Sequence, residues 1–181
     1  MKRDINASAK TSKFPRIIAY GLDYLVIVLL TSVVSYYAIN TKLGINYIIL
    51  NELPTDYRMF YDVIAIGVAI LAIVVIPLFN KGRTIGKTVM HLDLTNADNS
   101  LISKKKVLIR QGLIIFILGG LLNPNHIYLV DFFKLNMNNS MEYIQMIINA
   151  FSLFCGFMFL FTKGSCTIYD KYLKLNINVN K

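Results

Sequence analysis

The sequence predicts an all-α membrane protein with four transmembrane helices and a small cytoplasmic β-hairpin between the second and third helices. Three observations support this prediction. The chain has 181 residues, of which 55% are apolar, and its mean hydropathy of +0.53 is too high for one soluble domain. The apolar residues gather in four runs of membrane or near-membrane length. Most of the basic residues fall on one side of those runs.

The first apolar run, residues 17–39, is the longest of the four. As a helix its 23 residues would extend about 34 Å, enough to cross a hydrocarbon core of about 30 Å. Arg16 stands at its entrance, and Asp23 is the only charge inside it. Inserting a carboxylate into the membrane within such a helix costs at least ~2.5 kcal/mol unless it is protonated, reaches the interface or finds a partner. Arg16 and Asp23 share one helix face but lie about 10 Å apart along the axis, so other helices must supply the partners.

Three further apolar runs complete the predicted membrane domain, residues 14–175. The second run begins near Asp62, which we expect to stay hydrated at the interface, and it ends near Pro77. The third run is short for a span, and the fourth holds two amide side chains that would hydrogen-bond neighbouring helices. The other predicted segments are a basic N-terminal tail at 1–13, spans at 61–79, 107–122 and 143–161, and a C-terminal tail at 176–181.

The polar loop between the second and third runs is predicted to contain the hairpin. Met90, Leu92 and Leu94 alternate with polar residues, which is the periodicity of a half-buried strand. Residues 96–99 favour a turn, and residues 100–103 can return as a short partner strand.

A glycine-rich stretch opens this loop and contains Gly82, Thr84, Gly86 and Lys87. A phosphate-binding loop has four residues between its glycines and follows a strand, whereas here three residues intervene after an apolar helix. We therefore interpret the stretch as a structural glycine turn and reject nucleotide binding.

The distribution of charge predicts the topology. If both termini and the 80–106 loop are cytoplasmic, 16 of the 19 basic residues face the cytoplasm and 3 face outward, a strong positive-inside bias. The net charge of +9 then needs no nucleic acid partner, because the basic residues are scattered over three segments that each border a helix. We expect a multi-pass plasma-membrane protein with its N- and C-termini in the cytoplasm.

The sequence offers no catalytic, metal or cofactor site. Its two cysteines form no CxxC pair. His91 and His126 fall on opposite sides of the predicted membrane, so they cannot share a metal. No serine, cysteine or histidine stands beside a base at a membrane-accessible position that the sequence reveals. The sequence therefore predicts a protein that is not an enzyme.

Three separated stretches resemble the RDD family of membrane proteins, named for one arginine and two aspartates. They are PRIIAYGLDYLVI in the first run, NKGRTIGKTVMHLDLTNADNSLIS followed by KVLIR in the loop and third run, and TIYDK after the fourth run. The resemblance implies an integral bacterial membrane protein, and ion or small-solute transport has been proposed for some members. The chain departs from the family after Asp170, where YLKLNINV replaces a threonine-centred segment.

Four charged residues, Arg16, Asp23, Arg110 and Asp170, form the candidate site, and we call them the charged cluster. Helix geometry places all four toward one region near the cytoplasmic surface. Arginine suits such a site because it stays ionised and can fork to a carboxylate with two hydrogen bonds.

Two functions remain open from the sequence. In one, the chain is a transporter in which Asp23 exchanges protons for a cation or anchors a charged solute. In the other, it is a non-transporting subunit or regulator, in which the charged cluster locks four helices together and the basic loops or the hairpin dock a partner. The expected partners are the lipid bilayer and either further copies of this chain or another membrane protein.

Overall fold

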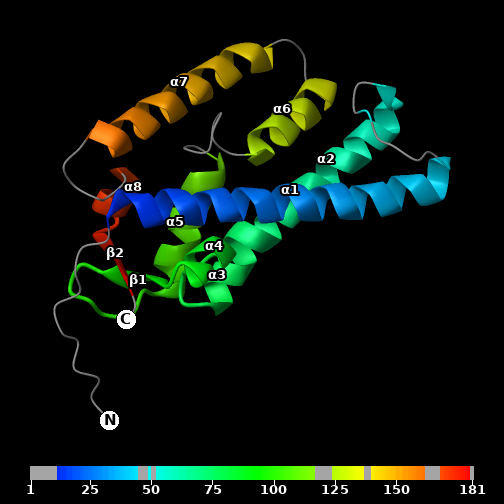
Figure 1. Ribbon diagram of the computed structural model, residues 1–181. Coiled ribbons are helices and arrows are strands. Elements are labelled where there is room, and N and C mark those ends of the chain that lie inside the picture. Colours follow the sequence, from blue (N-terminus) through cyan, green and yellow to red (C-terminus); the bar gives the residue numbers. More distant parts are fainter. Residues whose placement is uncertain are drawn as a thin grey trace.

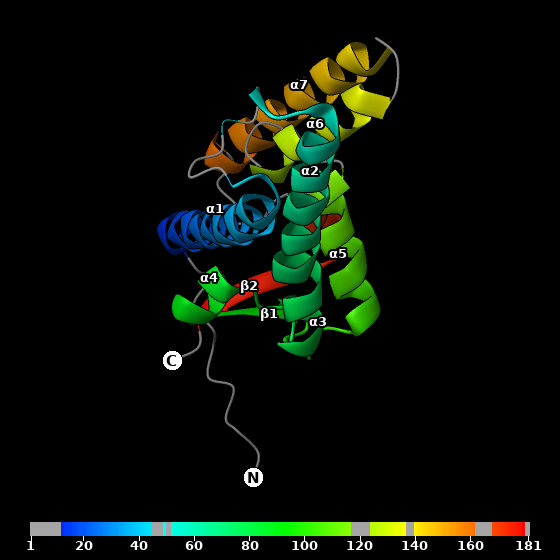
Figure 2. The same cartoon turned by 90° about the vertical axis from the view of Figure 1, so that its right-hand side faces the viewer.

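The computed structural model shows a helical protein with one small sheet near the N-terminal end of its longest helix, α1 (Lys13–Leu43) (Figure 1). The helices α6 (Pro124–Asn136) and α7 (Ser140–Phe161) lie on one side of α1. The sheet and the short helix α4 (Ile85–Val89) lie on the other side, as a view turned by 90° also shows (Figure 2). The structure describes residues 12–44, 49, 52–116, 124–136, 140–161 and 168–179. Residues 1–11 of the predicted tail at 1–13 lie outside these ranges, as do residues 180–181 of the predicted tail at 176–181.

The first predicted span lies within α1, a helix of 31 residues. α1 is about 46 Å long, which exceeds the hydrocarbon core of about 30 Å. It ends where Gly44 adopts a left-handed φ of +64° and donates its N–H to the Asn40 carbonyl at 2.8 Å. Only 17% of its most apolar stretch is buried. Its buried side chains recur at four-residue intervals at Ile27, Thr31, Ser35 and Ile39.

The second predicted span is a continuous helix of 25 residues made of three segments, α2 (Thr55–Ile70), η2 (Leu71–Val75) and α3 (Ile76–Phe79). It begins six residues before the predicted start at Tyr61. The η2 segment is a π-helical turn in which the Ile76 N–H bonds to the Leu71 carbonyl. A proline ring clashes with the carbonyl four residues back in a regular α-helix. The wider turn directly before Pro77 accommodates that ring and lets the helix continue.

The two long helices pack through small and branched side chains. Ile39 of α1 lies against Tyr61 and Ala65 of α2 in one apolar cluster, and Ile27 of α1 lies against η2 in another. Among the described residues, α1 and the α2–α3 helix are the two that are long and apolar enough to cross a membrane.

The third and fourth predicted spans are only partly described. α5 (Lys104–Phe116) covers the start of the predicted span at 107–122, and the remainder of that span lies outside the described residues. α7 has 22 residues and covers the predicted span at 143–161, with exposed apolar side chains that include Phe157 and Leu160. Helices therefore stand at the first, second and fourth predicted spans and at the start of the third.

The helix α6 lies between the predicted third and fourth spans. It packs against α2, where the rings of Tyr61 and Tyr128 lie 5.6 Å apart. The prediction that Asp62 stays hydrated is wrong, because α6 covers this part of α2 and the side chain is fully buried.

The sheet pairs β1 (Leu92–Asn96) with β2 (Leu175–Val179) in antiparallel register, so that Leu94 lies opposite Ile177. β1 forms where the alternating pattern predicts a strand. Its apolar face and that of β2 pack together against Ala19 of α1.

The predicted partner of β1 is wrong, because residues 100–103 do not form its second strand. They contribute a single bridge between Thr95 and Leu101, and Leu101 is 75% exposed. The C-terminal segment offers Leu175 and Ile177 for burial instead, and the predicted tail at 176–181 is therefore a strand as far as residue 179.

Candidate functional site

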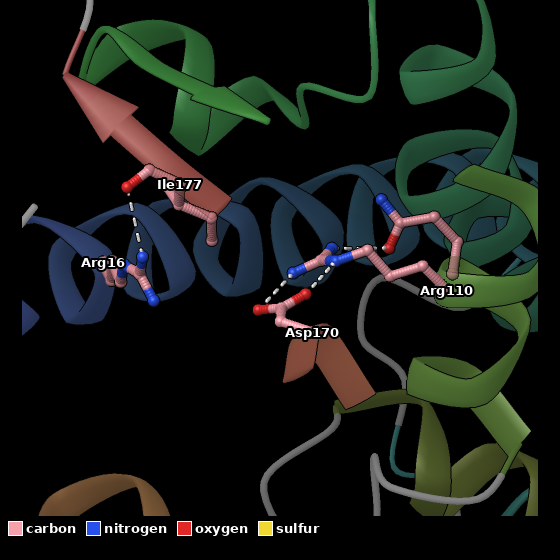
Figure 3. A network of polar contacts seen from close by, with 5 residues as sticks. Arg16, Arg110, Asp170 and Ile177 are labelled. Carbon is pink, nitrogen blue, oxygen red and sulfur yellow. Dashed lines mark hydrogen bonds and ion pairs between the residues drawn. The ribbon is translucent and has the colours of Figure 1, made fainter. Parts of the chain in front are cut away.

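Arg110 and Asp170 form a buried ion pair (Figure 3). The Arg110 Nε donates to Asp170 Oδ1 at 2.6 Å, and its Nη2 donates to Oδ2 at 3.4 Å. The two side chains are 3% and 1% exposed. Arg110 comes from α5, and Asp170 comes from α8 (Ile168–Tyr172), which leads into β2. The fork geometry thus ties the C-terminal segment to the third apolar region of the chain.

Arg16 fastens α1 to the sheet. Its side chain is buried, and its Nη2 donates to the Ile177 carbonyl at 3.3 Å (Figure 3). The guanidinium thereby holds β2 against the first turns of α1.

Asp23 takes its hydrogen bonds from the glycine-rich loop. The Thr84 hydroxyl donates to Asp23 Oδ2 at 2.6 Å, and the Gly86 amide donates to Oδ1 at 2.7 Å. Thr84 also caps α4, because its hydroxyl accepts the Lys87 N–H at 3.4 Å. The loop therefore supplies the donors that a carboxylate in this helix requires.

The two glycines of this loop have different structural roles. Gly82 adopts a φ of +81°, which favours glycine. Gly86 has no such constraint, but a Cβ at this position would lie 1.9 Å from the Ala19 carbonyl oxygen. Its missing side chain allows α4 to contact α1 closely enough for the Gly86 amide to reach Asp23.

The ammonium group of Lys87 interacts electrostatically with the residues of the charged cluster. Its side chain is partly buried. The pKa of its ammonium group is lowered to about 7, mainly by burial and then by the charge of Arg110. Asp170 and Asp23 act in the opposite direction, and Arg16 lowers the pKa slightly. Lys87 thus interacts with all four members of the charged cluster and can change charge near neutral pH.

The structure brings the predicted site residues to one end of α1. There they make separate contacts with different segments of the chain. Arg110 and Asp170 contact each other directly, whereas Asp23 bonds to Thr84 and Gly86. Sequence reasoning separated the glycine-rich loop from the charged cluster and so missed this contact. The available signal was the need of Asp23 for donors, which a loop hydroxyl and a free amide at a helix start can supply.

No group of three or more histidine, cysteine, aspartate or glutamate side chains is placed to hold a metal ion within the described ranges.

Two of the described helices are long and apolar enough to cross a membrane, and together with the family match that follows they indicate a membrane protein. The sequence model of the RDD family matches residues 11–174, and the chain belongs to that family. No curated protein and no solved structure is significantly similar to the chain.

Proposed function

We propose that this membrane protein transports a small ion or solute across the plasma membrane and couples the movement to a proton. The observation that carries the proposal is Lys87, a partly buried lysine whose pKa is lowered to about 7 by burial and is also affected by the charges of the four residues of the charged cluster. Titratable groups with such pKa values are concentrated at functional sites.

The charge balance of the site supports a coupling role. Arg16, Arg110 and protonated Lys87 give three positive charges against the two carboxylates, so the formal charge is +1. Loss of the Lys87 proton brings it to zero. A site that alternates between these charges binds a charged solute with different free energies in its two protonation states.

Proteoliposomes test this function. With an imposed pH gradient, we expect the wild-type protein to release the gradient when sodium, potassium or lithium is added. Lys87→Gln and Asp23→Asn should abolish the release while the proteins remain folded. Lys105→Gln is the matched control, because Lys105 is an exposed lysine at the start of α5. A wild-type protein that is silent with all three cations would contradict cation–proton exchange.

A non-transporting subunit or regulator is the second candidate, and the direct contacts of the site favour it. Each contact joins segments that are far apart in the chain: Asp23 to α4, Arg16 to β2, and Arg110 to α8. Such contacts lock helices together without needing a solute. In that case Asp23→Asn would lower thermal stability or release a partner protein. Transport would be absent from both the wild type and the variant. The mass in nanodiscs would distinguish a homo-oligomer from a subunit that needs another membrane protein.

The proposed topology has four spans, with both termini and the 80–106 loop in the cytoplasm. The positive-inside distribution of the basic residues supports this topology. Neither of the two candidate functions is enzymatic. Reporter fusions after Lys104 and after Lys181 should both report the cytoplasm. An external signal at Lys181 alone would mean that the chain crosses the membrane an odd number of times.

A further inference from the structure

A second polar group lies away from the charged cluster, between α2 and α6. It consists of Arg58 and Asp62 on α2 and Asp131 on α6. Asp62 is about 25 Å along the helix from Phe79, the residue that precedes the glycine-rich loop. The group is therefore at the opposite end of the α2–α3 helix from Lys87.

Asp62 is fully buried by the described residues. Its side chain is 0% exposed, and no described residue donates a hydrogen bond to either of its carboxyl oxygens. Next to it, the Tyr61 ring packs on Tyr128 of α6 and on Ile39 of α1. A bare carboxylate in such a place carries a large desolvation cost.

Arg58 already serves the other carboxylate. Its Nε donates to Asp131 Oδ2 at 2.5 Å, and its Nη2 pairs with Oδ1, so both edges of the fork are engaged. Asp62 stands one helical turn after Arg58 on α2, so its carboxyl lies beside the Arg58–Asp131 ion pair. With both carboxyls ionised, one guanidinium and two carboxylates give a net charge of −1.

Two further lysines stand on α1 and α6 among the described residues. On α1, the Lys42 ammonium lies over the Phe60 ring at 4.9 Å. On α6, Lys134 is exposed. The side chains of α1 that pack beside Tyr61 are the apolar Ile39 and Leu43.

We propose that Asp62 and Asp131 form a proton-binding carboxyl pair that holds one proton between them. Carboxylates only accept hydrogen bonds, so two facing carboxyls attract each other only when one carries a proton. Uptake of one proton from water gives Asp62 a donor for Asp131 and brings the net charge of the group to zero. A metal ion fits less well, because the described residues offer no set of three acidic or imidazole ligands. The inference stands whether or not the protein transports a solute.

Infrared spectroscopy of the purified protein in lipid nanodiscs tests the pair. At near-neutral pH we expect the wild type to show a protonated-carboxyl band that shifts in heavy water. Asp62→Asn and Asp131→Asn should each abolish the band, because the one remaining carboxylate is then balanced by Arg58. Asp56→Asn is the matched control, since Asp56 is exposed in the first turn of the same helix, and it should leave the band unchanged.

A further variant protects the test against misfolding of the aspartate variants. Arg58→Gln removes the balancing positive charge and leaves both aspartates in place, so the protonated-carboxyl band should persist in this variant. A wild type without the band, or a band that survives both Asp62→Asn and Asp131→Asn, would overturn the proposal. Replacement of the band by carboxylate absorption when sodium or lithium chloride is added would overturn it in favour of a metal cation.

Discussion

Gly86 and Asp23 are joined by a hydrogen bond of 2.7 Å from the Gly86 amide to the carboxylate. The contact exists because position 86 has no side chain and α4 can approach the backbone of α1 at Ala19. The carboxylate that is costly in the first helix and the glycine that the sequence predicts as a turn residue are thus partners in one hydrogen bond.

Gly86→Ala should destabilise the protein, because the new methyl group would overlap the Ala19 carbonyl and push α4 away from Asp23. Overpacking of this kind costs about 1–3 kcal/mol. The measurement is the free energy of unfolding in detergent micelles. Gly21→Ala is the matched control, since a Cβ at Gly21 meets nothing within 4 Å, and it should be neutral or stabilise by up to about 1 kcal/mol. Equal stability of the two variants would contradict the close approach of α4 and α1.

The Arg110–Asp170 pair should behave as a buried pair in a double-mutant cycle. Arg110→Gln and Asp170→Asn should each cost about 3–5 kcal/mol, and the double variant should recover part of that loss. Arg83 and Asp93 form a more exposed pair and serve as the control, with an expected coupling of about 0–1 kcal/mol. Similar coupling in the two cycles would argue that Arg110 and Asp170 are not desolvated together.

Asp23 and Arg110 should couple much less strongly than Arg110 and Asp170. Asp23 receives its hydrogen bonds from Thr84 and Gly86, so Asp23→Asn and Arg110→Gln should be close to additive in the free energy of unfolding. A coupling as large as that of the buried pair would mean that the two charges meet directly.

The stability of the protein should depend on Lys87 through pH. Its folded-state pKa of about 7 lies below the ordinary value of 10.5. Between these values the unfolded chain binds the proton and the folded chain does not, so the stability of the wild type relative to Lys87→Gln should rise with pH across this window. Below about pH 7 the lysine is charged in both states, and its burial penalty is largest. Thermal unfolding across the pH range measures the difference, and a difference that is constant with pH would contradict the lowered pKa.

The partner of β1 can be tested with two apolar truncations. Ile177→Ala should cost about 2–5 kcal/mol, because Ile177 is 5% exposed in the core of the sheet. Leu101→Ala should change the free energy of unfolding by less than about 0.5 kcal/mol, because Leu101 is 75% exposed. The reverse order would favour the local hairpin over the C-terminal strand.

The sequence by itself determined the membrane class, the two long helices and the position of β1. Apolar runs of this length can satisfy their backbone hydrogen bonds in lipid only by forming helices, so length and composition suffice. The alternation of Leu92 and Leu94 with polar residues is likewise a local signal. The same local logic singled out Arg16, Asp23, Arg110 and Asp170, because each charge is costly near an apolar run.

Only the tertiary structure decided which groups compensate those charges. The donors to Asp23 lie more than 60 residues away along the chain, the carboxylate for Arg110 lies 60 residues away, and β1 finds its partner at the C-terminus. The sequence predicts that Asp62 is a hydrated carboxylate at the membrane interface, whereas in the structure α6 covers it. Hydropathy and periodicity report the surroundings of a residue within its own helix or strand, whereas pairing depends on how separate elements pack, which no local pattern specifies.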